Sequence, residues 1–239
     1  MADSFWTRLA RELTEALDLQ TAPLAITFAA APPAEIPAFD AAMPAPTEDG
    51  RTGRVAAGCV FWVKAEERTF STVAADHGNC SVGLLTHGFA ALDEVGGNAD
   101  VAALLDSGWV RAEQVPGIPV VSQRPGAVIY GPLAEVTGEP SVVLLRLNAK
   151  QLMVLFDAVP GLRIEGKPQC HIVAAAHEQG AVVASVGCML SRVRTGMPDD
   201  QLTCALPASR LAEVTASIQR TAAVDATVGA YAKADSERF

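Results

Sequence analysis

The chain has 239 residues, half of them hydrophobic, and a formal net charge of −9 at pH 7, which suits one large domain or two small ones sharing a core. It contains no basic run, so the electrostatic footprint of a nucleic-acid binder is missing, and no apolar run reaches the length of a membrane span. Residues 1–6 carry no secretory signal, so we expect a soluble cytoplasmic protein whose cysteines stay reduced.

The N-terminal part predicts a surface helix, a strand and a long loop. Apolar residues recur at helical spacing between Trp6 and Leu17, with Asp3 or Ser4 as the cap. Residues 24–28 predict a short apolar strand. Residues 30–56 are rich in Pro, Ala and Gly and predict a long loop, which would be the lid if the protein is an enzyme.

A cysteine opens the next segment and another closes it. Cys59 is followed by a helix-compatible run at 60–67 and a β-leaning run at 69–73. A helix is then expected to begin near Cys80, where a thiolate would gain from the partial positive charge of the helix N-terminus.

The rest of the chain alternates between helices and strands. The expected elements are a helix at 100–106, strands at 128–130, 134–136 and 141–147, a helix at 149–159 capped by Asn148, a turn at 197–200, and a final helix opening at Pro207. Because strands alternate with helices, the predicted fold class is mixed α/β.

A second segment repeats the first cysteine pattern. Cys170 opens a helix-like run, a glycine turn and an apolar strand-like run, and Cys188 closes it. These units predict a single domain, 1–239, built from two interlocked halves of about 1–110 and 111–239. We expect a pseudo-twofold axis between them, with a strand, a helix and a Cys–helix–strand–Cys unit in each half.

Several motifs are shared with a known family. They are Gly58-Cys59, Cys80-x-x-Gly83, Gly131-Pro132-Leu133, Pro168-x-Cys170 and Gly187-Cys188-x-x-Ser191-Arg192. Over nearly its whole length the chain resembles the DUF169 (ArCR) family of uncharacterised bacterial and archaeal proteins. The resemblance implies that Cys59, Cys80, Cys170, Cys188 and Arg192 are positions of the family pattern. It implies no settled activity.

The chain also departs from that pattern. It has Ser81-Val82 where the family tends to have Pro-Gly after the second cysteine, and Met189-Leu190 where the family tends to have a glycine. Cys204 has no counterpart. The loop around the fourth cysteine is therefore expected to differ in shape.

The four matching cysteines predict a common metal centre. If the halves pack around a shared axis, the sulfurs of Cys59, Cys80, Cys170 and Cys188 could meet. Four thiolates suit a [4Fe–4S] cluster, with Zn as the alternative. The leading hypothesis is an Fe–S protein with a redox, sensing or small-molecule role. The alternatives are a metal-free small-molecule binding module with packed cysteines, and a thiol oxidoreductase acting through Cys80.

Other residues carry weaker predictions. Arg192 is expected to hold an anionic ligand, to offset a thiolate centre, or to form an ordinary salt bridge. His171 could reach the same centre, although a buried histidine bonded to backbone is the simpler expectation, and His77 is expected on a solvated loop. The expected partner is an unknown redox protein or small molecule, and a homodimer is possible on composition.

Overall fold

The computed structural model describes residues 4–40 and 57–236. Its strands are β1 (Leu24–Ala29), β2 (Phe70–Thr72), β3 (Ala127–Pro132), β4 (Val142–Leu147), β5 (Arg163–Glu165), β6 (Val183–Ser185) and β7 (Leu202–Pro207). They form one sheet in the order β2-β3-β1-β4-β7-β6-β5. Neighbours pair antiparallel except β5 and β6, which are parallel, so the predicted mixed α/β class is confirmed.

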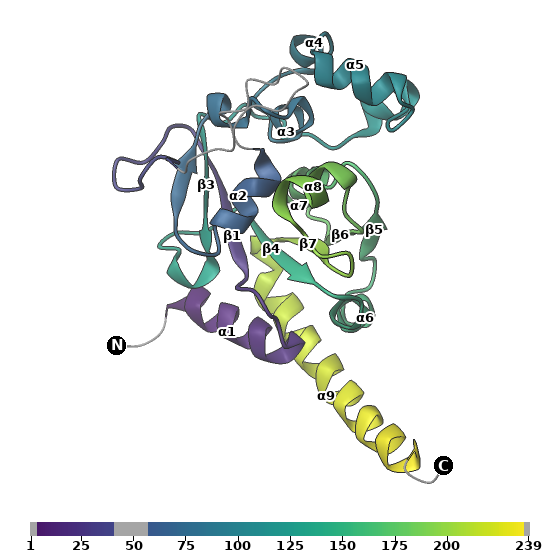
Figure 1. Cartoon of the computed structure of the whole chain (residues 1–239). Helices are drawn as coiled ribbons and strands as arrows, with labels where there is room; N and C mark the ends of the chain where they lie inside the picture. Colours follow the sequence, from purple (N-terminus) through teal and green to yellow (C-terminus); the bar gives the residue numbers. More distant parts are fainter. Residues whose placement is uncertain (1–3, 41–56, 237–239) are drawn as a thin grey trace.

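Helices cover both faces of this sheet (Figure 1). The α-helices are α1 (Phe5–Leu17), α2 (Gly58–Lys64), α3 (Ser81–Thr86), α4 (Leu92–Val95), α5 (Ala99–Asp106), α6 (Ala149–Ala158), α7 (His171–Gln179), α8 (Met189–Thr195) and α9 (Leu211–Ser236). The 3₁₀ turns are η1 (Ala74–His77), η2 (Ala112–Gly117), η3 (Leu133–Glu135) and η4 (Ala208–Arg210). No helix of the described chain is long and apolar enough to cross a bilayer.

Strand β4 shows how the sequence divides the core between the two faces. Val143, Leu145 and Leu147 pack against α1, α6 and α9, while Val142 and Leu144 pack toward α2 and α7. Successive side chains of a strand point to opposite faces, so a strand buried on both sides has to be apolar throughout. The unbroken apolar run at 142–145 is therefore the mark of a central strand.

The strands are arranged in a similar way on the two sides of the central β1–β4 pair. On one side β1 pairs with β3, and β3 pairs with β2. On the other side β4 pairs with β7, and β7 pairs with β6. The registers agree as well, since Leu24 faces Pro132 and Val142 faces Pro207. Each set carries a helix–strand–helix unit, α2-β2-α3 or α7-β6-α8. This is the connectivity that two similar halves require, and the twofold rotation itself stays a prediction.

Two expectations about individual elements need correction. The strand predicted at 134–136 is wrong, because η3 forms there and the Ala134 carbonyl accepts a hydrogen bond from the Thr7 hydroxyl at 2.8 Å instead of joining the sheet. The strand β7 was not predicted. It lies buried between β4 and β6, yet its threonine, cysteine and terminal proline gave no continuous apolar run.

Part of the predicted loop at 30–56 lies in the described chain. Residues 30–40 contain no regular element beyond an isolated bridge between Ala38 and Ser71. Residues 41–56, where most of the predicted lid falls, lie outside the described residues.

Candidate functional site

The four cysteines singled out by the sequence line one pocket. Cys59 is the second residue of α2, and Cys80, Cys170 and Cys188 directly precede α3, α7 and α8. All four are free thiols; Cys80 is buried, and the other three are half-buried. The helix–strand–helix units therefore bring cysteines far apart in the sequence to one side of the sheet, where α2 and α8 are in contact.

Glycines next to two of these cysteines make room for the site. A side chain at Gly58 would come within 3.2 Å of the His87 ring. Gly187 has a φ of +95°, and a side chain there would meet Arg192 and Gln169 at 3.3 Å. A left-handed residue is accessible to glycine at little cost, so Gly187 turns the chain from β6 into α8 and sets the position of Cys188.

Burial keeps two of the pocket thiols, Cys59 and Cys170, protonated. Burial raises the pKa of Cys59 to about 11, and the charge of Cys80 adds to the shift. Burial likewise raises the pKa of Cys170, again with a contribution from Cys80, against a hydrogen bond from Thr86. Removing protons from such a set needs a compensating cation, and binding of a metal to thiols releases those protons.

Arg194 is the cation of this pocket. It donates to the Asn79 carbonyl at 3.2 Å and interacts with Cys80, Cys59 and Cys188. Burial acts to lower the pKa of Arg194, but the hydrogen bond with Cys80 and the charges of Cys80, Cys59 and Cys188 together outweigh it, and the pKa is raised.

Sequence reasoning named Arg192 and missed Arg194. The Arg192 guanidinium donates to the backbone carbonyls of Val186 and Gln201, both at 3.1 Å, and to that of Pro198, so it ties together the two ends of the α8 segment. Residues three apart share a face of a helix. Cys188, Ser191 and Arg194 have that spacing and all line the pocket, so a prediction of α8 would have pointed to Arg194.

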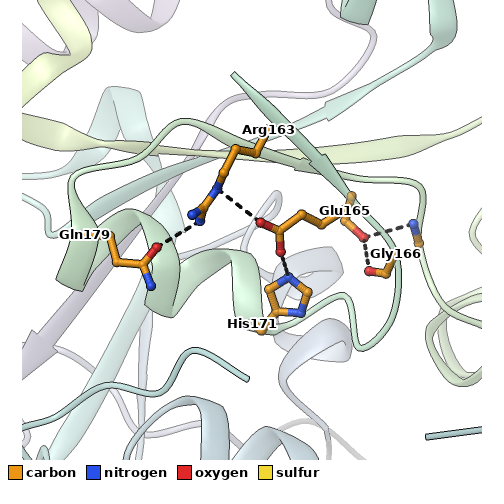
Figure 2. A network of polar contacts seen from close by, with 7 residues as sticks. Arg163, Glu165, Gly166, His171 and Gln179 are labelled. Atoms are coloured by element: carbon orange, nitrogen blue, oxygen red, sulfur yellow. Dashed lines mark hydrogen bonds and ion pairs between the residues drawn. The ribbon is translucent and has the colours of Figure 1, made fainter. Parts of the chain in front are cut away.

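His171 lies at the edge of a different hollow. Its Nε2 contacts the Glu165 carboxylate, and Arg163 reaches the same carboxylate at 3.1 Å while donating to Gln179 at 2.9 Å (Figure 2). His171 does not line the cysteine pocket. The expected bond to backbone is replaced by a bond to a carboxylate from β5, a strand that was not predicted.

Two further histidines lie deep beside the site. His77 was expected on a solvated loop, and this is wrong, because its side chain is fully buried and its Nε2 lies 3.1 Å from the Thr72 hydroxyl. His87 bonds the Gly83 carbonyl through Nδ1 at 3.0 Å. Burial lowers the pKa of both, that of His87 to about 4. Their remaining ring nitrogens have no partner.

Three features decide whether a metal group fits the pocket: the donor atoms, their arrangement and the free volume. The donors are four thiols, and the buried Gln169 Oε1 at the pocket has no hydrogen-bond partner. Among residues 4–40 and 57–236, no three His, Cys, Asp or Glu side chains are arranged to hold one metal ion. The free volume of the pocket is about 30 Å³, enough for about two water molecules. The donor set therefore fits a thiolate-bound group, and its present spacing is not that of a single-ion site.

Comparisons with known proteins give a family and no activity. The model of the family described as DUF169, uncharacterised ArCR, matches residues 12–217. The match includes all four pocket cysteines. No curated protein and no solved structure matches the chain.

Proposed function

Since the chain belongs to the DUF169 family, whose description carries no activity, its function has to be argued from the site, and we propose that it binds a [4Fe–4S] cluster. The ligands are Cys59, Cys80, Cys170 and Cys188. The bound cluster would serve a redox, sensing or small-molecule role in a reducing cytoplasm.

The observation that carries the proposal is the meeting of four free thiols in one pocket. They come from the starts of four separate helices in two units of the same connectivity. Four cysteine thiolates are the usual ligand set of such a cluster. If the cysteines served only as small hydrophobic residues of the core, packing alone would give no reason for all four to line one pocket with an arginine.

A zinc ion and a four-iron cluster need different sulfur spacings. A single Zn ion with four bonds of about 2.3 Å draws its sulfurs to about 3.8 Å from one another. A four-iron cluster is larger and holds its thiolates further apart. It is also larger than the free space in the pocket. The proposal therefore requires the cysteine side chains and their walls to move outward during assembly.

Charge supports the same site. Four thiolates around a cluster leave a net negative charge, which is costly away from water unless a cation lies near it. Arg194 supplies that cation within the pocket.

The test is anaerobic purification followed by an absorption spectrum and a count of iron, sulfide and zinc per chain. We expect iron and sulfide at about four each. Replacing any pocket cysteine by alanine should remove most of the iron, while Cys204→Ala should keep it, because Cys204 packs on the opposite face of the sheet. Zinc without sulfide would establish the alternative metal. Equal metal content in all five variants would refute a four-cysteine site.

A further inference from the structure

A second hollow adjoins the cysteine pocket. Its volume is about 540 Å³, within the usual range of small-molecule sites. It lies between the 109–119 segment and the connection from β5 to α7. Its lining residues include Trp109, Glu113, Ile118, Pro119, Glu165, Lys167, Pro168 and His171.

The two cavities share part of their walls. Trp109 and Pro168 line both, and His171 of the hollow follows Cys170 of the pocket directly in the chain. A molecule in the hollow would therefore lie one layer of side chains away from the sulfurs.

The acidic groups of the hollow already have partners. The Glu165 carboxylate contacts Arg163 and His171, as Figure 2 shows, and Glu113 lies 3.3 Å from Arg111. Their negative charges are thus offset within the protein. The side chain of His171 is only 6% exposed, which fixes one polar wall of the hollow.

The basic group of the hollow has no such partner. Lys167 is exposed, and its Nζ lies 4.8 Å from the centre of the Trp109 ring. Within the described parts of the chain it forms no ion pair with a carboxylate. The hollow therefore presents an ammonium group beside an indole ring, with the apolar side chains of Ile118 and Pro119 on the same wall.

From this arrangement we propose that the hollow binds a small organic carboxylate. The carboxylate pairs with the Lys167 ammonium, and the apolar body lies against Trp109, Ile118 and Pro119. Binding at this site stands whether or not the cysteines hold a cluster. Only the further step, that the bound acid is the substrate or effector of the cysteine centre, rests on the proposed function.

Calorimetric titration of the full chain, purified anaerobically, tests the proposal. The probes are benzoate and hexanoate, which differ in their apolar body, and benzamide as the neutral counterpart of benzoate. We expect saturable binding of at least one acid at up to millimolar concentration, about tenfold tighter than benzamide. No saturation by either acid, or equal binding of benzoate and benzamide, would overturn the proposal.

Three variants locate the site. Lys167→Gln should weaken binding of the acid about tenfold and leave benzamide unchanged. Trp109→Ala should weaken both, because it removes the apolar wall. Lys150→Gln, on the exposed start of α6, is the matched control and should bind as the parent does. An acid affinity that falls equally in Lys167→Gln and Lys150→Gln would contradict the assignment.

Iron content measured on the same samples keeps the two ideas separate. Binding of the acid by a sample without iron would support the carboxylate site and refute the cluster. Iron in a sample that binds no acid would support the cluster and refute the carboxylate site.

Discussion

At the scale of single residues, the region of the site contains buried polar side chains that lack a hydrogen-bond partner. Gln169, His77 and His87 each have a buried polar atom without a hydrogen-bond partner. Such atoms are rare in native proteins because each costs about 1–3 kcal/mol. Ordered water or a bound group beside these atoms would complete their hydrogen bonds.

His87 makes the stability of the fold depend on pH. Burial lowers its pKa from 6.5 to about 4. Below pH 6.5, the histidine is therefore protonated in the unfolded chain but stays neutral in the folded chain until the pH approaches 4. Stability is therefore full above pH 6.5 and falls as the pH is lowered toward 4. This group alone should cost about 2 kcal/mol at pH 5 relative to pH 7.

Urea unfolding of the metal-free chain at pH 5 and pH 7 measures this effect. His77, whose ring centre lies 5.3 Å from that of His87, acts in the same direction. His87→Gln should reduce the difference between the two pH values even if it lowers stability at both. A pH dependence identical to that of the parent would show that His87 does not carry a lowered pKa.

At the scale of elements, the starts of helices matter most. Three cysteines occupy the cap position of α3, α7 and α8, where the backbone changes from its preceding conformation into a helix. Caps are usually Ser, Thr, Asp or Asn, and Cys188 takes that role by accepting from the Ser191 N–H at 3.4 Å. Conventional capping residues are used elsewhere in the chain.

Helix α6 has such a conventional cap. Asn148 accepts from the Gln151 N–H at 3.0 Å, and the Gln151 side chain accepts from the Asn148 N–H at 2.8 Å. We expect Asn148→Ala to lower the free energy of unfolding by about 1 kcal/mol with an unchanged urea m-value. Lys150→Ala, on the exposed side of the same helix, should change it by less than about 0.5 kcal/mol. Equal losses in the two variants would show that the cap contributes nothing specific.

At the scale of the whole molecule, the sheet separates a structural face from the cysteine face. The α1, α6 and α9 side holds one apolar cluster, and the α2 and α7 side holds the other together with the site. Helix α9 also runs well beyond the body (Figure 1), and its last buried residue is Ile218. Val224, Val228 and Tyr231 on this extension are exposed.

Removal of residues 224–239 should therefore leave the rest of the fold intact. We expect a melting temperature within about 2 °C of the parent and unchanged iron content, because the deleted turns bury no core residue. Light scattering on the same samples reports whether the exposed stripe joins two copies, as the predicted homodimer would allow. A large loss of stability at constant mass would show that the extension supports the body.

Much of the fold was predictable because its signals are local. The helices α1 and α6, the strands β1 and β4 and the paired cysteine units follow from side-chain periodicity, caps and spacing over short stretches. Strands β5 and β7 were missed, since their identity rests on neighbours that come from elsewhere in the chain.

The sequence by itself determined the family, the mixed α/β class and the four cysteines, because composition and motif spacing are properties of the chain alone. Only the tertiary structure decided that these cysteines share one pocket, that Arg194 rather than Arg192 lies among them, and that Lys167 faces a hollow beside them. The physical reason is that a side chain's surroundings depend on the packing of distant segments. Burial and charge pairing, which set pKa and binding, arise only when those segments meet.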